Sequence, residues 1–350
     1  VVGPLLARKF VGAVAPGRYG AGVLAADLDA LDGGALLVGH FALDLVVEIR
    51  GAVHNGRFFV FAGRCEPEQR CGCQQQFLFH DACEVRIGGV AIGGEHPVAV
   101  QSMTNTDTND TAASVAQIER IDRAGGHIVR LTAQGRREGE NLGNIVRQLR
   151  ADGFRTAVVA DIHFVPEVAA VAAKYVDKVR INPGNYRTDH GEFEALIEQC
   201  RERGVALRIG VNHGSLAKRV FDEWGDTPQG MVVSAMEFLR VCRERNFDQV
   251  VVSMKSSNTR VMVAAYRLLV EAMDAEDMHY PIHLGVTEAG NGIEGRVKSA
   301  VGIGALMADG IGDTIRVSLT EAPENEIPVA RLLVEHFADR PGTFEVRHPE

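Results

Sequence analysis

The chain has few cysteines and no long apolar run. Six cysteines are spread over 350 residues, too few for a disulfide-stapled secreted scaffold. A membrane-spanning helix needs about 18 consecutive apolar residues, and the nearest run, GALLVGHFALDLVV, is interrupted by His40 and Asp44. Near the start, Arg8 and Lys9 are not followed by the clean apolar segment of a signal peptide. We therefore expect a cytoplasmic protein without a membrane partner.

The chain also lacks an excess of positive charge. Its formal net charge is −9, so the composition does not indicate a general nucleic-acid-binding surface. With 46% hydrophobic and 24% charged residues, the composition is that of an ordinary globular protein with enough apolar residues for one large domain. A local cluster of cations on such an acidic protein would favour a small, highly charged anion.

Residues 1–82 show no sustained periodicity and no motif. Alternation appears only in short pieces such as RFFVFAG, and we interpret this part as an uncharacterised extension, disordered or not native. Cys65, Cys71 and Cys73, with Cys83, have the spacing C-x5-C-x-C-x9-C, which is not typical of zinc or iron–sulfur sites. We therefore predict no metal site here. Cys200 and Cys242 lie on apolar helical faces and are predicted to be core residues.

From Cys83 onward the pattern becomes regular. Residues 84–96 have alternation around a Gly-Gly turn and predict a hairpin. Eight strand-like runs, apolar on both faces, then alternate with helical patterns as far as residue 337. No GxGxxG follows the first strand, which disfavours a doubly wound open sheet. We predict an α/β protein, a (β/α)8 TIM barrel over residues 83–340, followed by a linker at 341–350.

Seven of the predicted strands finish in a charged residue. Because a parallel barrel gathers the carboxyl ends of its strands on one face, these side chains are expected to converge. Five cations against two carboxylates would suit a diphosphate, which arginine binds bidentately; the alternative is ordinary surface ion pairs. The seven residues are Arg130, Asp161, Arg180, Arg208, Lys255, Glu288 and Arg316.

Other polar residues stand beside these strand ends. Asn182 and Asn212 could bond a substrate hydroxyl or phosphate oxygen, although NPGN at 182–185 is also a good turn. Glu288 could be a general acid for a leaving hydroxyl, or could merely neutralise a cation. Asp161 and His163 face the same way in an extended segment and could position a substrate oxygen, or could be a structural pair.

These motifs together resemble one enzyme family. The chain is similar to the 4-hydroxy-3-methylbut-2-enyl diphosphate synthases, iron–sulfur enzymes of the methylerythritol phosphate route to isoprenoids, from about residue 84 to 337. VRLTAQG and GDTPQGMV look most like the longer, three-domain branch of plants and some bacteria. The motifs are VQSMTNTDT, VRLTAQG, VADIHF, KVRINPGN, RIGVNHGSL, GDTPQGMVVSAMEFL, KSSN, HLGVTEAG, KSAVGIGALMADGIGDTIRVSL and EIPVARLL.

The resemblance implies a substrate and a set of site residues. The family's barrel binds 2-C-methyl-D-erythritol 2,4-cyclodiphosphate and opens its ring reductively to give 4-hydroxy-3-methylbut-2-enyl diphosphate. Glu288 matches the essential glutamate, with Asp161 and Lys255 also expected in catalysis and His163 at the substrate. The expected diphosphate-binding positions are Arg130, Arg180, Asn182, Arg208, Asn212, Lys255, Arg316 and Ser318.

The resemblance also implies parts that this chain lacks. Family members carry a 4Fe–4S cluster held by three cysteines and a glutamate on a further domain, and receive electrons from ferredoxin or flavodoxin. No cysteine follows Cys242, so we expect that domain in cis, if the sequence is a fragment, or in trans. A plant source would place the protein in the plastid stroma. A non-catalytic diphosphate-binding remnant and a pterin-binding-type barrel enzyme remain as alternatives.

Overall fold

The computed structural model describes residues 22–26, 52–54, 57–62, 82–162, 165–186 and 191–338. The chain divides into two compact units, Val1–Gln74 and Gln75–Glu350. In the first, β1 (Gly22–Ala26), β3 (Arg57–Ala62) and β2 (Ala52–His54) form an antiparallel sheet in that order. Cys65, Cys71 and Cys73 lie outside the described residues. So do most of the predicted extension and the whole of the predicted linker.

The second unit contains the predicted barrel. Eight strands pair in parallel, and a bridge between Val252 and Ile282 joins the first and last strands of the sheet. The TIM-barrel prediction is therefore confirmed. The strands are β6 (Ala99–Met103), β7 (Ile128–Ala133), β8 (Ala157–Ile162), β9 (Lys178–Ile181), β10 (Ala206–Asn212), β11 (Val250–Lys255), β12 (His283–Leu284) and β13 (Thr314–Ile315).

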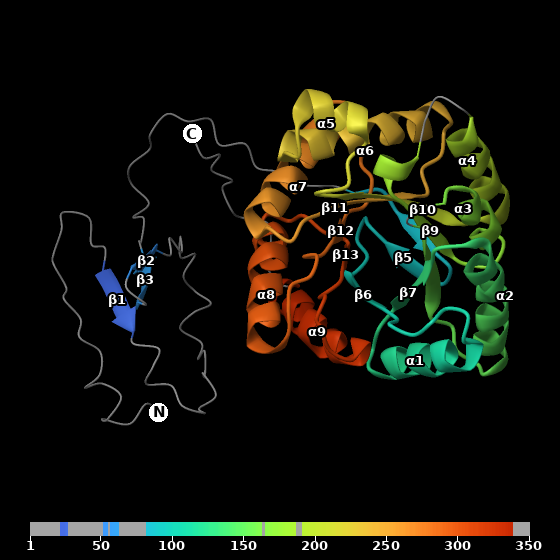
Figure 1. The fold of residues 1–350 in the computed structure, drawn as a ribbon, viewed down its shortest axis with the longest axis horizontal. Coiled ribbons are helices and arrows are strands. Elements are labelled where there is room, and N and C mark those ends of the chain that lie inside the picture. Colours follow the sequence, from blue (N-terminus) through green and yellow to red (C-terminus); the bar gives the residue numbers. More distant parts are fainter. Residues whose placement is uncertain are drawn as a thin grey trace. The chain divides into compact units, whose positions relative to one another are not determined.

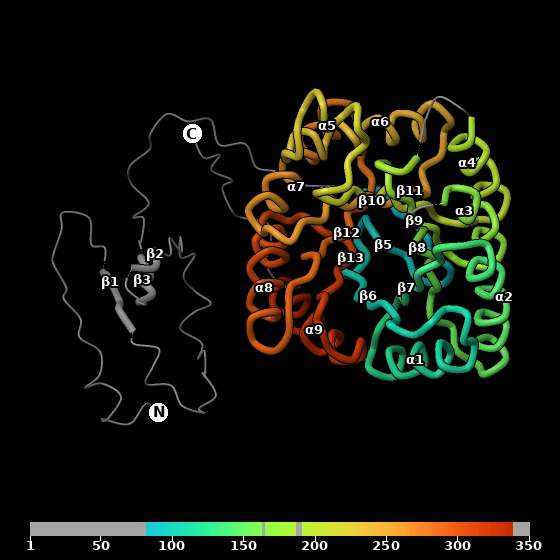
Figure 2. Tube along the Cα trace, in the orientation of Figure 1, coloured from blue at the N-terminus to red at the C-terminus, as the bar shows by residue number. Residues whose placement is uncertain are grey.

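Helices form a ring around these strands (Figure 1), and the Cα trace in Figure 2 follows the same alternation around the ring. None of the helices in the described part is long and apolar enough to cross a membrane. The helices are α1 (Thr111–Arg123), α2 (Arg136–Ala151), α3 (Glu167–Ala172), α4 (Glu192–Arg203), α5 (Lys218–Trp224), α6 (Pro228–Glu244), α7 (Thr259–Asp274), α8 (Gly292–Ala308) and α9 (Glu326–Phe337), with short 3-10 turns η3 (Pro183–Asn185) and η4 (Pro323–Asn325).

Several helices begin at a side-chain cap. The Asp110 carboxylate accepts from the backbone of Ala113 at the start of α1, and the Thr227 hydroxyl accepts from Gly230 in α6. Asn258 caps α7 in the same way. These caps stand in the loops that follow the carboxyl ends of β6, β10 and β11, so they fix the loops that border the barrel opening.

A two-stranded hairpin closes the amino-terminal end of the barrel. β4 (Val85–Ile87) and β5 (Val90–Ile92) pair antiparallel across the Gly88–Gly89 turn, where Gly88 has a φ of 56°. The apolar side chains of the hairpin cover the lowest inward-facing residues of the barrel strands, forming an apolar floor. Its members are Val85, Ile87, Ile92, Ala99, Ile128, Ala157, Val159, Ala206 and Val251.

The pairing register orders the residues inside the barrel. Followed once around the barrel, the pairings return to β6 displaced by about eight residues, the shear of a TIM barrel. Side chains from alternate strands therefore share layers of four. The lowest of four successive layers contains Val159 of the floor together with Gln101, Arg208 and His283. The next layer contains Arg130, Arg180, Ser253 and Arg316, and the third contains Met103, Asp161, Gly210 and Gly285. The fourth layer, at the mouth of the barrel, contains Thr132, Asn182, Lys255 and Ser318.

This arrangement corrects two expectations. The strands are not apolar on both faces, because above the floor their inward positions are largely polar. Arg130 and Arg208 do not close their strands: each is the third residue of its strand, β7 and β10. The cationic region therefore begins deep within the barrel rather than at its rim.

Candidate active site

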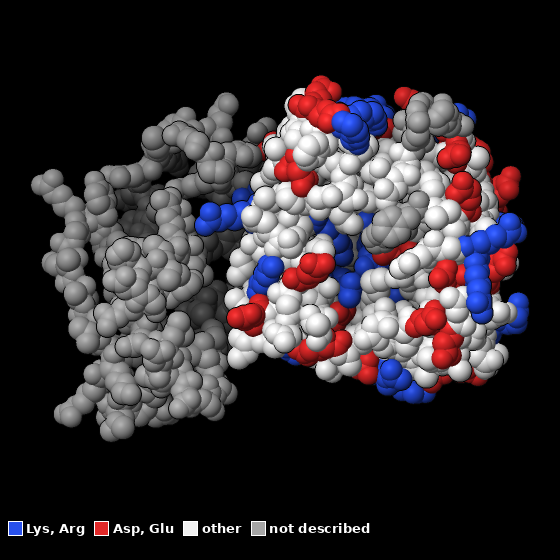
Figure 3. All heavy atoms as spheres, viewed as in Figure 1, with Lys and Arg blue, Asp and Glu red and all other residues white. Residues whose placement is uncertain are grey.

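Five cations predicted from the sequence lie inside the carboxyl-terminal half of the barrel. Arg130, Arg180, Arg208 and Lys255 are all buried, with exposed fractions between 0% and 7%, and the Arg316 side chain is 13% exposed. Figure 3 shows Lys and Arg atoms in a hollow at the centre of the barrel. Surface ion pairs, the alternative for these residues, are excluded by this burial.

Asp161 joins two of the arginines. Its Oδ2 lies 3.3 Å from Arg130 Nε, and its Oδ1 accepts from Arg180 Nη1 at 2.9 Å. Arg180 Nη2 also donates to the Gly210 carbonyl at 2.8 Å. Gly210 is required here, because a Cβ on it would lie 2.3 Å from Arg180 Nε.

A second buried carboxylate, Glu326, was not predicted. It accepts from Arg316 through Nε at 3.2 Å and Nη2 at 3.1 Å, from the Ser102 hydroxyl at 2.7 Å, and from the backbone of Leu319 at 3.1 Å. Glu326 opens α9 rather than closing a strand, so the search for strand-end residues missed it. The signal was available in the EIPVARLL motif, where the acidic residue precedes an apolar helix.

Met103 is another residue that sequence reasoning missed. Its sulfur accepts from Arg130 at 3.0 and 3.3 Å and lies 3.5 Å from Arg316 Nη1. A thioether is a weak acceptor, so these guanidinium groups keep much of their capacity to bind an anion.

Burial acts on the charges of this cluster. Desolvation, and then neighbouring arginines, hold the pKa of Lys255 and of Arg208 well below their ordinary values. Desolvation also lowers the pKa of Arg130 to about 10, although Asp161 opposes it, so this guanidinium stays charged at neutral pH. Within the described chain, the nitrogens of the Arg208 guanidinium have no hydrogen-bond partner. An anion bound among these groups would relieve both the desolvation and the mutual repulsion.

The asparagines and Ser318 lie at the same end of the barrel. Asn182 forms the turn that its sequence indicated: its Oδ1 accepts from Gly184 at 3.1 Å, and its Nδ2 donates to Ser215 Oγ at 2.8 Å. Asn212 pairs with Lys255 in the sheet. Both Asn212 and Ser318 are partly exposed and could reach a ligand. The roles of all three in ligand binding remain predictions.

Glu288 is exposed in the loop after β12, with a φ of 49°. This left-handed backbone is uncommon for a residue with a side chain. No ion pair joins Glu288 to another described residue, so neutralisation of a cation gains no support and the carboxylate is free to meet a ligand. His163, the predicted neighbour of Asp161, lies outside the described residues.

The cysteines within the described part do not fit an iron–sulfur cluster. Burial raises the pKa of Cys83 to about 11 and that of Cys200 to about 12, which disfavours the thiolates that ligate iron. Cys200 and Cys242 are fully buried in the apolar layer between strands and helices, as predicted. Among the described residues, no group of three or more His, Cys, Asp or Glu could hold a metal.

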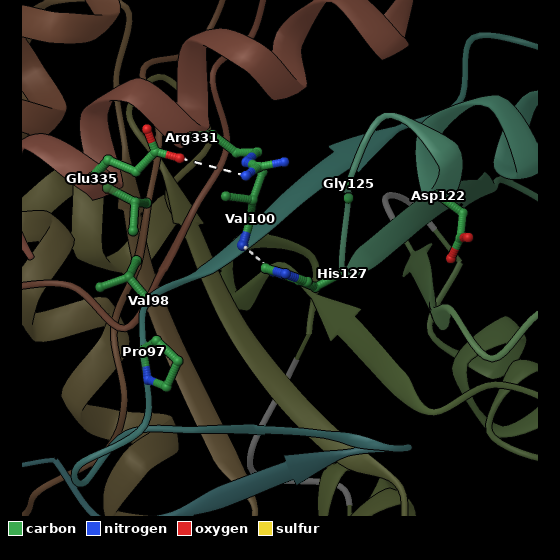
Figure 4. A pocket seen from close by; sticks show the side chains of 10 residues that line it. Pro97, Val98, Val100, Asp122, Gly125, His127, Arg331 and Glu335 are labelled. Atoms are coloured by element: carbon green, nitrogen blue, oxygen red, sulfur yellow. Dashed lines mark hydrogen bonds and ion pairs between the residues drawn. The ribbon is translucent and has the colours of Figure 1, made fainter.

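A separate cavity of about 450 Å3 lies at the amino-terminal end of β6 and β7. In Figure 4 the His127 ring faces the Val100 backbone, whose N–H donates to His127 Nδ1 at 3.0 Å, and Arg331 approaches Glu335. Because this cavity lies at the opposite end of the strands from the cationic residues, it belongs to a different part of the barrel from the candidate active site.

Comparisons with known proteins agree with this geometry. The chain is 56% identical over 283 residues to the 4-hydroxy-3-methylbut-2-en-1-yl diphosphate synthase (flavodoxin) of Phocaeicola vulgatus, covering 75% of this chain and 46% of the relative. It is 57% identical over 277 residues to the enzyme of the same name from Parabacteroides distasonis, covering 73% of this chain and 45% of the relative. The chain thus spans about half the length of these relatives.

A solved structure and a family model complete the comparison. The dihydropteroate synthase of Yersinia pestis, solved with a sulfonamide, aligns with a TM-score of 0.51 at 11% identity, covering 74% of this chain and all of that one; at this identity it supports the barrel fold alone. The model described as the GcpE TIM-barrel domain matches residues 82–331. With a matching domain model over most of the chain and relatives above 50% identity, this protein belongs to the GcpE family.

Proposed function

We propose that this chain supplies the substrate-binding barrel for the reductive ring opening of 2-C-methyl-D-erythritol 2,4-cyclodiphosphate to 4-hydroxy-3-methylbut-2-enyl diphosphate in isoprenoid biosynthesis. The observation that carries the proposal is the burial of five cations, Arg130, Arg180, Arg208, Lys255 and Arg316, in one end of the barrel. The names of the relatives give the product and flavodoxin, and the family resemblance of the sequence motifs supplies the substrate and the ring opening.

The charge of the site supports a diphosphate ligand. Asp161 is shared by Arg130 and Arg180, and Glu326 pairs with Arg316. Two buried carboxylates thus face five cations, and neither Arg208 nor Lys255 has a carboxylate partner among the described residues. Buried charge of one sign is costly unless it is paired, and guanidinium groups bind phosphate oxygens through two parallel bonds.

In the proposed reaction the barrel stabilises the charge that moves onto the diphosphate. The ring C–O bond to phosphate breaks, a neighbouring hydroxyl leaves as water, and a carbon–carbon double bond forms; two electrons and two protons balance the change. Cations already positioned around the diphosphate would stabilise the departing oxygen without reorganising. Glu288 would protonate the leaving hydroxyl, with Lys255 and Asp161 orienting the reacting end.

The electrons would come from outside this barrel. The relatives' names specify flavodoxin, and we propose flavodoxin or ferredoxin as the donor here. The described cysteines do not fit a 4Fe–4S cluster, so its ligands would belong to an iron–sulfur domain in cis or in trans. Such a domain would need to face the barrel mouth, where the bond breaks.

Calorimetric titration of the full chain with the cyclic diphosphate tests the binding half of the proposal. Arg180→Ala and Arg208→Ala should each weaken binding at least tenfold, about 1.4 kcal/mol, because each removes a buried cation. Lys255→Met provides a further variant if an arginine variant fails to fold. Arg203→Ala, on the exposed end of α4, is the matched control and should bind as the wild type does.

Three results would contradict the assignment. Unchanged affinity in all three site variants would show that the cyclic diphosphate does not occupy the cationic mouth. Tight binding of a pterin in place of the diphosphate would instead support the pterin-barrel alternative. Diphosphate binding without turnover, even after a competent iron–sulfur domain is added, would support a non-catalytic remnant.

A further inference from the structure

A second set of polar residues lies among and below the deepest of the five cations, toward the barrel floor. It consists of Gln101, Lys178, Ser253 and His283, each between 0% and 1% exposed. In the described structure no hydrogen-bond partner is present for the Gln101 amide, Lys178 Nζ, Ser253 Oγ or His283 Nε2. Buried polar groups in native proteins are nearly always satisfied, so several missing partners in one place indicate that something else fills the space.

The register brings these residues together. Gln101, Arg208 and His283 share one layer, and Lys178 belongs to the layer beneath it. Arg208 forms the boundary with the mouth, because its guanidinium is also buried and also lacks a hydrogen-bond partner. Desolvation first, and then the neighbouring cations Lys255, Arg208 and Lys178, hold the pKa of His283 well below its ordinary value; desolvation and then Arg208 do the same for the pKa of Lys178.

The cluster is rich in donors and poor in acceptors. Lys178 offers three N–H groups, Arg208 five and Gln101 two. His283 Nδ1 lies 2.6 Å from Thr314 Oγ1; when that hydroxyl donates to Nδ1, the ring proton is on Nε2, which then also donates. Gln101 Oε1 and Ser253 Oγ are the unpartnered acceptors of the cluster. Each water molecule accepts two hydrogen bonds but also brings two donors, so water leaves the excess of donors unchanged, whereas a bare anion only accepts.

The charges lead to the same conclusion. Among the described residues, the two carboxylates of the barrel interior are already engaged, Asp161 by two arginines and Glu326 by Arg316. A cyclic diphosphate carries one negative charge on each phosphate, and Lys255 at the mouth and Arg208 deeper in the barrel would match these two charges. Lys178 lies a layer below Arg208 and would still have no counter-charge.

We propose that the barrel holds a monovalent inorganic anion, chloride under ordinary conditions, between Lys178, Gln101, Arg208 and His283. The anion accepts from the unpartnered donors and keeps Lys178 charged. It lies beneath the substrate diphosphate as a fixed counter-ion. Arg208 borders both sites, whereas Lys178, Gln101 and His283 belong to the anion site alone, so the anion site does not depend on the proposed reaction.

Thermal unfolding of the full chain tests the site. At constant ionic strength, replacing gluconate by chloride or bromide should raise the melting temperature by roughly 5 °C when the halide is near 100 times its dissociation constant. The increase should persist when inorganic pyrophosphate saturates the mouth. Lys178→Met should abolish the halide response. It should be at least as stable as the wild type in gluconate, because it removes a buried amine whose pKa is held well below its ordinary value by desolvation and then by Arg208. Lys174→Met, an exposed neighbour on the same segment, should respond as the wild type does.

Crystals grown in bromide supply the direct readout. We expect an anomalous scattering peak beside Lys178 Nζ in the wild type and none in Lys178→Met. Ordered waters alone at that position would overturn the proposal. So would a halide response that pyrophosphate abolishes, because the halide would then occupy the mouth. Unchanged diphosphate affinity in Arg180→Ala and Lys255→Met would contradict the proposed function without affecting the halide result, so the two failures can be told apart.

Discussion

Glu326 shows how one residue can determine the orientation of a site cation. It holds Arg316 through two nitrogens and is itself held by Ser102 and by the backbone of Leu319. At 1% exposure, its charge is screened very little by water. Arg316 therefore faces the mouth from a fixed position rather than as a flexible side chain.

Glu326→Gln should destabilise the protein by about 2 kcal/mol, because it leaves a largely buried guanidinium without its counter-charge. Chemical denaturation measures the change. Glu324→Gln is the control: its carboxylate pairs with the half-exposed Arg120, and a surface pair of this kind contributes at most about 1 kcal/mol. Equal effects of the two substitutions would show that Glu326 has no special structural role.

His283 should give the protein a specific pH dependence. Desolvation, together with Lys255, Arg208, Lys178 and Arg130, holds the pKa of His283 well below its ordinary value. In the unfolded chain this histidine binds a proton below about pH 6.5, whereas in the folded chain it stays neutral. Stability should therefore be unaffected above that pH and should fall below it, by about 1.4 kcal/mol per pH unit.

Denaturation between pH 5 and 8 in chloride-free buffer checks this expectation. In His283→Gln, the free energy of unfolding should fall less steeply as the pH decreases below about 6.5, and the change in slope should correspond to about one bound proton. This change is expected whatever the substitution does to absolute stability. His279→Gln, an exposed histidine, should leave the slope unchanged. A slope that is equal in all three proteins would show that His283 titrates normally in the fold.

At the scale of the strand, glycines make room for the long cationic side chains. Gly210 and Gly285 occupy two positions of one interior layer, with Met103 and Asp161 in the others. A Cβ on Gly285 would lie 2.8 Å from Lys255 Nζ and 2.9 Å from the Arg316 carbonyl. The glycines of β10 and of the segment after β12 are therefore part of the site although they carry no functional group.

Gly210→Ala should displace Arg180, whose Nε would lie 2.3 Å from the new Cβ. We expect at least a tenfold loss of pyrophosphate affinity by calorimetry, about 1.4 kcal/mol, together with a lower melting temperature. Gly89→Ala, in the hairpin turn where an added Cβ meets nothing within 4 Å, is the control and should change neither. Normal affinity in Gly210→Ala would mean that Arg180 does not contact the ligand.

Sequence periodicity predicted the elements, and the barrel rule predicted which residues would converge. Arg180 and Lys255 were found because they stand near the ends of apolar runs. Lys178 and His283 were not predicted as interior residues, because each is the first residue of its strand. Such a position lies inside the barrel only because of the shear of the closed sheet, which the sequence pattern does not show. Glu326 was missed because α9 brings it to β13 from outside the strands. Strand register and contacts between distant segments are therefore the features of this site that could not be predicted from the sequence.

At the scale of the molecule, the barrel interior is positively charged although the chain as a whole is acidic. The chain as a whole carries a net charge of −9, while the described residues of the barrel interior include six basic side chains, Lys178 among them, and two carboxylates. An anionic ligand must therefore be drawn past an acidic exterior into a cationic interior, and much of its binding energy would come from replacing water around buried guanidinium groups. Association should consequently weaken as salt concentration rises.

The proposed function assigns substrate binding to the barrel and electron delivery to a separate iron–sulfur domain, and this division predicts the behaviour of the isolated chain. The chain covers about half of its relatives, and the thiols that the structure describes are buried or protonated at neutral pH. With a chemical reductant, the purified chain should bind the cyclic diphosphate and yield no allylic diphosphate, as measured by phosphorus NMR.

Adding an iron–sulfur domain from a relative should restore turnover. Glu288→Gln should then reduce turnover while leaving substrate affinity within about twofold, or 0.4 kcal/mol. Product formed by the lone chain, with iron bound at Cys65, Cys71 and Cys73, would instead place the redox centre in the amino-terminal unit.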